Sequence, residues 1–332
     1  MHAELVGREF LRMGDSLTVF APYVESASRW WHHRLIKEDE EYVVRCYEEI
    51  DPAGRGGRVD MDTILGHEFD ALIVESYASL PYGDVEKLAE RLKGRAKVLL
   101  VVHEGGPEQL RYTDLEVFDR VVVFDERYVR EVVRGRVSED RLAIVPFPCH
   151  PVAPPPEPRR HAGRVRFFSF GRQPVREYAP YIEALDRLSR GYELEYLVVR
   201  ADDKRLQVER EWLVQRMERL DTPQIYRYLH ASDVHLIPKG DTHYVVVSST
   251  LCQCLGALCP TVAPATRHFE MLPSRNGVAP AVLYTSVDEL VEKLRRLIED
   301  EDFRRGVVRM AEEYVRQNSS GVVAARLKQL MV

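Results

Sequence analysis

The sequence predicts an α/β protein made of two Rossmann-like domains. Short apolar runs bounded by turn residues alternate with amphipathic stretches along almost the whole chain, which is typical of βαβ units around a parallel sheet. The 332 residues exceed the ~100–200 residues of one domain. Between the two halves, PVAPPPEPRRHAGR at Pro151–Arg164 cannot form a helix or a central strand, because prolines lack amide donors and fix φ. We therefore expect domains at 1–150 and 165–332, joined by a linker at 151–164.

The first domain is predicted from its apolar runs. Its helices are expected at Asp84–Lys93 and Glu126–Arg134, the first with apolar residues spaced for one helical face. The chain starts at a helical stretch, HAELVGREFLRMG, so the first strand of a complete sheet and its glycine-rich turn are expected to be missing. The expected strands are Leu17–Ala21, Val43–Cys46, Ala71–Glu75, Val98–His103, Arg120–Phe124 and Ala143–Pro146.

The second domain repeats the alternation. The stretch from 207 to 220 fits either a helix or a strand, and we expect a strand at Trp212–Met217 because the second sheet otherwise lacks a member. A last helix around Ser319–Met331 could return to the first domain. The other expected strands are Val165–Phe170, Glu195–Val199, Val234–Pro238, Thr261–Ala263 and Ala281–Tyr284, and the helices are Tyr178–Arg190, Gln224–Ala231, Thr250–Leu258, Val287–Glu299 and Asp302–Gln317.

Composition excludes several classes of protein. The chain is 45% hydrophobic and 30% charged with a net charge of -6, which disfavours both disorder and nucleic-acid binding. It lacks a spanning apolar run and a signal-peptide layout, so we expect a cytoplasmic protein. Five cysteines without a CxxC pair favour neither a disulfide framework nor a zinc ribbon.

Several familiar motifs are missing from the sequence. We find no GxGxxG fingerprint, Walker A loop, HExxH helix or GxSxG elbow. The pair His32–His33 follows Trp30–Trp31 without acidic or cysteine neighbours, so we expect a packed loop or an acceptor-pocket lining there. No metal site and no cofactor are predicted.

The loop after the fourth strand of the first domain is the sharpest candidate site. His103 and Glu104 leave the carboxyl end of that strand, and Gly105–Gly106 would let a ligand approach the backbone. We take His103 and Glu104 as the catalytic candidates, with His103 contacting substrate and Glu104 diverging from it. The alternative is a strand-end turn in which His103 merely caps a backbone group.

Two segments of the second domain could bind a diphosphate. Gly171 permits a tight turn, and the guanidiniums of Arg172 and Arg176 suit phosphate oxygens, although exposed arginines are common. Ser248, Ser249 and Thr250 precede a helix, where free amides bind phosphate, although taken alone this segment is better explained by simple N-capping. The later segment TRHFEML, with Glu270, follows another strand end or forms a packed loop.

In their order and spacing, these pieces resemble GT-B-fold glycosyltransferases of the glycogen synthase and retaining mannosyltransferase group, which is glycosyltransferase family 4-like. The resemblance spans nearly the whole chain and rests on His103, Gly171–Arg172, ASDVHLIPK at Ala231–Lys239, SSTLCQCLGALCPTV at Ser248–Val262, and Glu270. It implies two Rossmann-like domains facing across a cleft, the first on the acceptor side and the second binding the nucleotide-sugar donor.

The resemblance also implies roles. His103 would lie beside the sugar, while Gly171, Arg172, Arg176, Ser248, Ser249, Thr250, Gln253 and Glu270 would bind the donor. The implied reaction transfers a hexose from a nucleotide-diphosphate sugar to a hydroxyl acceptor with retention and without a metal. The acceptor could be a glycan, a small molecule or a lipid-linked compound, and the last would add a peripheral membrane contact.

Two positions depart from the family pattern. Val245 and Gln253 stand where the family often has two glutamates, although an amide can still hydrogen-bond a hydroxyl. Two other interpretations therefore stay open. One is a GT-B pseudoenzyme or partner subunit that has lost donor chemistry, and the other is a nucleotide-sugar 2-epimerase, which needs more carboxylates.

Overall fold

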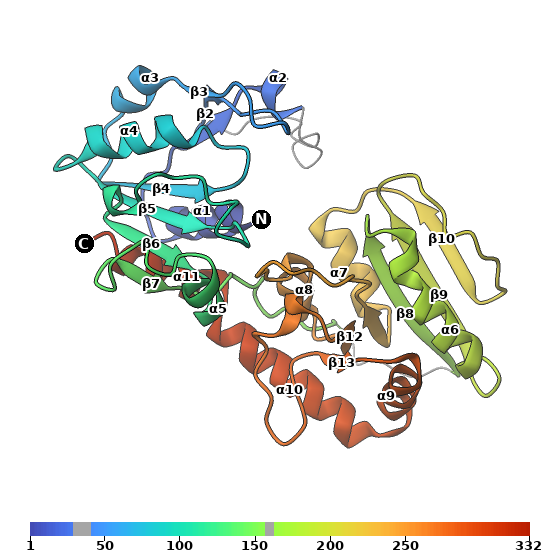
Figure 1. The fold of residues 1–332 in the computed structure, drawn as a ribbon. Coiled ribbons are helices and arrows are strands. Elements are labelled where there is room, and N and C mark those ends of the chain that lie inside the picture. Colours follow the sequence, from blue (N-terminus) through green and yellow to red (C-terminus); the bar gives the residue numbers. More distant parts are fainter. Residues whose placement is uncertain (29–40, 157–162) are drawn as a thin grey trace. The chain divides into compact units, whose positions relative to one another are not determined.

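The chain folds into two compact units (Figure 1). The computed structural model describes residues 1–28, 41–156 and 163–332. Unit 1 comprises Met1–Pro146, Tyr244–Val246 and Gly321–Val332, and unit 2 comprises Phe147–His243 and Val247–Ser320. Two segments that follow residue 165 in the sequence therefore belong to the first unit. Trp30–Trp31 and His32–His33 lie outside the described residues, as does part of the proline-rich stretch.

Unit 1 contains two sheets. Strands β4 to β7 form a parallel sheet in sequence order, whereas β1 pairs with β2 in parallel and β2 pairs with β3 antiparallel. The expectation of one doubly wound sheet is therefore wrong for the first two strands, which in the described parts of the chain pair with each other and with the unpredicted β3 and not with β4 to β7. The strands are β1 (Val19–Pro22), β2 (Val43–Glu48), β3 (Arg58–Val59), β4 (Ala71–Ser76), β5 (Lys97–Val102), β6 (Arg120–Val123) and β7 (Leu142–Ile144).

The helices of unit 1 follow the apolar spacing of the sequence. Helix α4 buries Val85, Leu88, Ala89 and Leu92, the face that the sequence predicted. Helix α11 supplies most of the C-terminal part of unit 1, and its Lys328 pairs with Asp15 at 2.6 Å. The helices are α1 (His2–Arg12), α2 (Val24–Ala27), α3 (Met61–Leu65), α4 (Tyr82–Leu92), the 3-10 turn Leu115–Val117, α5 (Glu126–Glu131) and α11 (Ser320–Gln329).

Unit 2 is built on one parallel sheet of six strands in the order β10-β9-β8-β11-β12-β13. Counted from β8, this is the 3-2-1-4-5-6 order of the doubly wound fold, whose ligand crevice lies at the carboxyl ends of the strands where the order reverses. That point falls between β8 and β11. The strands are β8 (Arg164–Gly171), β9 (Glu193–Arg200), β10 (Leu213–Met217), β11 (Val234–Leu236), β12 (Thr261–Pro264) and β13 (Val282–Tyr284).

Helices complete the core of unit 2. Apolar residues of α6 and α9 pack on the sheet in one buried cluster that includes Phe167, Leu185, Val198 and Leu290. The helices are the 3-10 turn Val175–Tyr178, α6 (Ala179–Leu188), α7 (Thr222–His230), α8 (Ser249–Cys254), the 3-10 turns Leu255–Ala257 and Arg267–Phe269, α9 (Val287–Glu299) and α10 (Glu301–Gln317).

The predicted elements of unit 2 are confirmed within a few residues. The ambiguous stretch contains the strand β10 at Leu213–Met217, paired in parallel with β9. The expected helix Thr250–Leu258 is shorter, because α8 ends at Cys254 and the chain tightens into a 3-10 turn before Leu258 adopts a left-handed φ of 55°. All five cysteines are buried as free thiols. Among the described residues, no helix combines the length and the apolar character needed to cross a membrane.

Candidate functional site

Three neighbouring strands of unit 2 end in one row. Gly171 at the end of β8 is in register with Arg200 of β9, and Arg200 is in register with Met217 of β10. Arg172 follows Gly171 directly and Arg219 lies two residues after Met217, so both emerge at the carboxyl edge of the sheet. The sequence did not suggest Arg219, because only the pairing of β10 next to β9 places it beside Arg172.

Arg200 lies in the middle of this row. Its side chain is fully buried, and Nε and Nη2 donate to the two carboxylate oxygens of Asp202 at 3.0 and 2.8 Å. The guanidinium lies 5.1 Å from the ring centre of Tyr178. Its Nη1 has no hydrogen-bond partner among the described residues. Asp202 is thereby engaged mainly by Arg200, which limits its capacity to neutralise the other arginines.

Arg172 and Arg219 influence each other. Burial lowers the pKa of Arg172, and the positive charge of Arg219 lowers it further, with Asp202 opposing. Burial also lowers the pKa of Arg219. By surface area both side chains are exposed, so the repulsion between their positive charges is the stronger argument, and an anion bound by both would relieve it. The row can therefore bind a phosphate or diphosphate group.

Further charged groups lie at the same edge. Arg176 is exposed on the 3-10 turn Val175–Tyr178. Lys239 follows β11 on the other side of the point where the strand order reverses, and burial lowers its pKa while Glu177 opposes the shift. Gly171 has a φ of +125°, and a Cβ there would lie 2.6 Å from Oε1 of Gln173. Glycine is therefore needed where the chain turns out of β8.

The start of α8 is arranged as a cap. The hydroxyl of Ser248 is buried and accepts a hydrogen bond from the amide of Leu251 at 3.2 Å, so the capping alternative describes this residue. Ser249 is exposed and Thr250 is half-buried. The side-chain amide of Gln253 donates to the hydroxyl of Thr222 at 3.4 Å. With only six residues in α8, the arginine row is the stronger anion site of the two.

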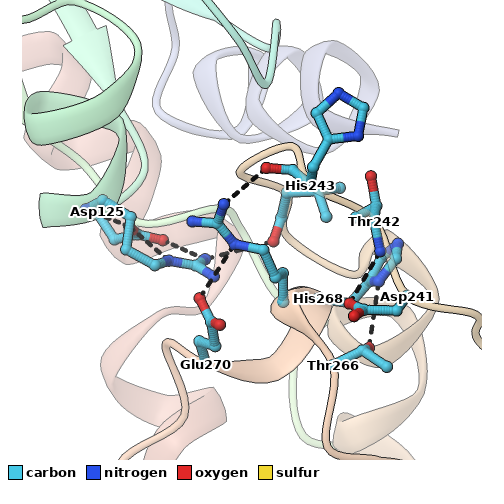
Figure 2. Close-up of polar contacts among 10 residues, drawn as sticks. Asp125, Asp241, Thr242, His243, Thr266, His268 and Glu270 are labelled. Carbon is cyan, nitrogen blue, oxygen red and sulfur yellow. Dashed lines mark hydrogen bonds and ion pairs between the residues drawn. The ribbon is translucent and has the colours of Figure 1, made fainter.

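The segment around Glu270 is joined to the loop before α8. Nη1 of Arg267 donates to the carbonyl of His243 at 2.7 Å, and its Nε lies 3.5 Å from Glu270 (Figure 2). His268 accepts the amide hydrogen bond of Ser248 on its carbonyl at 3.3 Å and contacts the Thr266 hydroxyl with Nδ1 at 3.3 Å. These bonds fix the start of α8 relative to the strand end of β12.

In unit 1, another backbone segment of the protein packs closely against Gly105. The amide of Val245 donates to the carbonyl of Gly105 at 2.9 Å, and a Cβ on Gly105 would lie 2.3 Å from the Val245 carbonyl oxygen. The expectation that Gly105 leaves room for a ligand is therefore wrong, because the Tyr244–Val246 segment occupies that room. Val245 itself is buried.

His103 and Glu104 point to different partners, as the sequence predicted. Glu104 is 4% exposed and accepts hydrogen bonds from the hydroxyls of Ser76 at 2.6 Å and Tyr82 at 2.9 Å. Its second oxygen, Oε2, has no partner among the described residues. Burial raises the pKa of Glu104, although these hydrogen bonds oppose the shift. Glu104 thus lies in the core of unit 1.

His103 belongs to a cluster that the sequence did not suggest. Its Nε2 lies 2.6 Å from Oε2 of Glu75, whose Oε1 lies 2.7 Å from Nδ1 of His2. The ligand atoms of these three residues lie within 4.8 Å of one another, a spacing that could also hold a metal ion. The ring of His103 stacks on Tyr77 with centroids 4.2 Å apart and meets Phe124 edge-on at 5.0 Å. The sequence did not reveal this cluster, because its members are far apart along the chain and come from α1, β4 and the loop after β5.

The fold of this chain is similar to that of several solved structures. The chain aligns with the GtfA/B complex (TM-score 0.56, 15% identity, 81% of this chain and 58% of that one). It also aligns with an α,α-trehalose-phosphate synthase (UDP-forming) from Burkholderia xenovorans in complex with glucose-6-phosphate (0.58, 12%, 82% and 75%) and with Anabaena Alr3699/HepE in complex with UDP and glucose (0.57, 15%, 81% and 80%). The chain has the GT-B fold.

A family model described as "Glycosyl transferase-like" matches residues 176–331. That range covers most of unit 2, including Arg176, Arg200, Arg219 and the start of α8. The match spans 156 of the 332 residues, a little under half of the chain, and the solved structures show the fold. The chain spans little more than half of the GtfA/B chain that it matches, since it covers 58% of it.

Proposed function

We propose that this protein is a hexosyltransferase that moves a sugar from a nucleotide-diphosphate donor to a hydroxyl acceptor with retention of configuration. The fold and the family match support glycosyl transfer in general. The observation that carries the proposal is the arginine row at the carboxyl edge of the sheet in unit 2. It lies next to the point where the strand order reverses, which is where doubly wound sheets bind nucleotides.

The donor diphosphate is assigned to Arg172, Arg176 and Arg219. A departing nucleoside diphosphate carries negative charge, and guanidiniums bind phosphate oxygens through paired, charge-assisted hydrogen bonds. The positive charges of Arg172 and Arg219 repel each other, and a bound anion would offset this repulsion. In this proposal the arginines stabilise the leaving group, and the reaction uses no metal or other cofactor.

The remaining donor contacts follow the family resemblance. Gly171 lets the chain approach the phosphates closely, the amides of Ser249 and Thr250 contact the same group, and Gln253 and Glu270 bind sugar or ribose hydroxyls. Ser248 supports them as the cap of α8. His103 in unit 1 contacts the transferred sugar or the acceptor hydroxyl, and we place the protein in the cytoplasm with a glycan, a small molecule or a lipid-linked compound as acceptor.

A nucleotide screen tests the proposal. UDP, GDP and ADP are titrated into the full chain by calorimetry and thermal shift, beginning with UDP because the Anabaena protein was solved with UDP and glucose. We expect one nucleoside diphosphate to bind and raise Tm, and the corresponding nucleotide sugar to be consumed when acceptors are supplied. If none of them binds, the donor assignment is wrong.

Arginine variants locate the binding. Arg172→Ala and Arg219→Ala should each weaken the binding free energy of the nucleotide by about 1.5–3 kcal/mol, the range for a charge-assisted hydrogen bond. Arg216→Ala is the matched control, since Arg216 lies on β10 near Arg219 but donates to the hydroxyl of Tyr228 at 2.8 Å. Equal nucleotide affinities for wild type, Arg172→Ala and Arg219→Ala would show that the diphosphate does not bind at these arginines.

A further inference from the structure

The geometry points to Asp202 as the residue that recognises the ribose of the donor nucleotide. We propose that its carboxylate accepts hydrogen bonds from the ribose hydroxyls, so that the site selects ribonucleoside diphosphates over their 2′-deoxy counterparts. The inference rests on the proposed function, because it assigns a further part of the same donor. Gln253 and Glu270 are then left for the hydroxyls of the sugar.

Asp202 lies at the carboxyl edge of the sheet in unit 2, two residues after the end of β9. The amide of Ala201 donates to the carbonyl of Gly171 at 3.2 Å, which extends the pairing with β8 to the residue before Asp202. Burial and the charge of Arg219 lower the pKa of Arg172, whereas the charge of Asp202 opposes this shift. Asp202 is therefore within electrostatic reach of the residues assigned to the diphosphate, to which the ribose is directly bonded.

A buried guanidinium fixes the carboxylate of Asp202. Nε and Nη2 of Arg200 donate to Oδ1 and Oδ2 of Asp202 at 3.0 and 2.8 Å, a paired arrangement that sets the plane of the carboxylate. The side chain of Arg200 has no exposed surface and lies against the ring of Tyr178, 5.1 Å from its centre. The carboxylate is therefore oriented before a ligand binds, which lowers the cost of ordering it on binding.

The ion pair leaves Asp202 with the capacity to accept further hydrogen bonds. Each oxygen of an ionised carboxylate has two lone pairs, and Arg200 uses one on each oxygen. The side chain of Asp202 is 19% exposed, whereas that of Arg200 is fully buried, so Asp202 is the member of the pair that meets solvent. Asp202 thus offers two acceptors in a fixed geometry, which suits the two neighbouring hydroxyls of a ribose.

Charge determines which part of a nucleotide Asp202 can bind. A carboxylate repels phosphate oxygens and needs a hydrogen-bond donor as its partner. An ionised diphosphate carries acceptors only, whereas both ribose hydroxyls can donate. In doubly wound sheets that bind dinucleotides, an acidic residue near the end of the second strand bonds the ribose hydroxyls. In unit 2 that second strand is β9, which follows β8 in the sequence and pairs with it.

Paired ligands test the ribose contact on the wild-type protein. The nucleoside diphosphate found in the screen and its 2′-deoxy form are each titrated into the full chain by calorimetry. We expect the 2′-deoxy form to bind about ten-fold or more weakly, which is the loss expected for one hydrogen bond to a charged group. Equal affinities for the two ligands would overturn the proposal without any variant.

Variants assign the contact to Asp202. In Asp202→Asn the preference for ribose over 2′-deoxyribose should fall to about two-fold or less, because the charged acceptor is lost. Asp202→Glu keeps a carboxylate for the buried Arg200, so it replaces Asp202→Asn if that variant does not fold, and its displaced oxygens should also lose the preference. The matched control is Asp203→Asn, since Asp203 is exposed and its φ of 55° suits asparagine. It should keep the wild-type preference.

The outcomes separate this inference from the proposed function. A nucleoside diphosphate that binds without a preference for ribose overturns the inference and leaves the donor assignment intact. A preference that survives in the Asp202 variants shows that another residue recognises the ribose, which also overturns it. A chain that binds none of the nucleoside diphosphates contradicts the proposed function, and the role of Asp202 is rejected with it.

Discussion

The two units share the parallel α/β plan but differ in what lies at the carboxyl ends of their strands. In unit 2, one sheet of six strands ends in Arg172, Arg200 and Arg219, with Lys239 after the next strand along. In unit 1, the sheet of four strands ends in Glu75 and His103, and Glu104 beside them in the sequence is buried. The first edge is cationic, whereas the second is made of imidazoles and carboxylates.

In the proposed reaction, this difference gives the two units different roles. Guanidiniums attract and hold a charged leaving group, so changes in unit 2 should appear mainly in nucleotide affinity. A histidine held by a carboxylate orients a hydroxyl and adds little to the binding of a diphosphate. Changes in unit 1 should therefore appear mainly in turnover.

The largest effect is expected at His103. His103→Ala should lower kcat about a hundred-fold or more, since the loss falls on positioning in the transition state, and should leave the Kd of the nucleoside diphosphate within about two-fold. Steady-state kinetics and calorimetry measure the two quantities. His67→Ala is the control, because the ring of His67 in unit 1 contacts Phe20 and bonds the carbonyl of Thr63 at 2.8 Å, apart from the cluster of His103. If His103→Ala instead weakens nucleotide binding and leaves turnover normal, the roles assigned to the two units are wrong.

A backbone change in unit 2 should come next. Gly171→Ala forces a side chain into a left-handed φ of +125° beside Gln173, which costs about 1–3 kcal/mol. Both the free energy of unfolding and nucleotide affinity should fall, as measured by denaturant titration and calorimetry. Gly191→Ala has no atom within 4 Å of the new Cβ and should change neither; a Gly171→Ala protein that binds nucleotide as tightly as wild type would separate Gly171 from the site.

The two units also differ in how far the sequence predicted them. In unit 2 every expected strand overlaps an observed one, and even β10, whose sequence also fitted a helix, was placed from the need for another strand. In unit 1 the sheet of β1, β2 and β3 was missed, because β3 has only two residues and its pairing depends on tertiary contacts. Local pattern predicts elements, whereas strand pairing between distant segments is set by packing.

The candidate sites follow the same rule. Gly171–Arg172 and His103 could be predicted because each directly follows an apolar strand. Arg219 and Glu75 could not, since their importance depends on which strands lie side by side. Gly105 misled the sequence argument, because a glycine that allows close approach does not reveal whether a ligand or the chain itself approaches.

A third prediction concerns the buried carboxyl of unit 1. Burial raises the pKa of Glu104, so the folded protein holds a proton that the unfolded chain releases. The contribution of Glu104 to stability should therefore fall as pH rises from the ordinary glutamate range to the raised pKa, by about 1.4 kcal/mol for each pH unit between those two values. It is measured as the difference in stability between wild type and Glu104→Gln, because buried His235, whose pKa burial lowers, contributes an opposite slope to both proteins. Urea midpoints between about pH 5 and about pH 8 measure it, with Glu86→Gln retaining the wild-type slope.

The smallest effect is expected at the cap of α8. The Ser248 hydroxyl accepts the amide of Leu251 at 3.2 Å in a buried position, and loss of such a cap costs about 1 kcal/mol. Ser248→Ala should therefore lower the free energy of unfolding by about that amount, and it should weaken nucleotide binding only if the first turn of α8 contacts the donor. Ser249→Ala is the matched control, since Ser249 is exposed and makes no cap. Denaturation and calorimetry on both variants distinguish the two roles. If Ser248→Ala costs stability but leaves the affinity for nucleotide unchanged, α8 is only a structural neighbour of the arginine row; if both fall together, the donor site extends from the arginines to this helix.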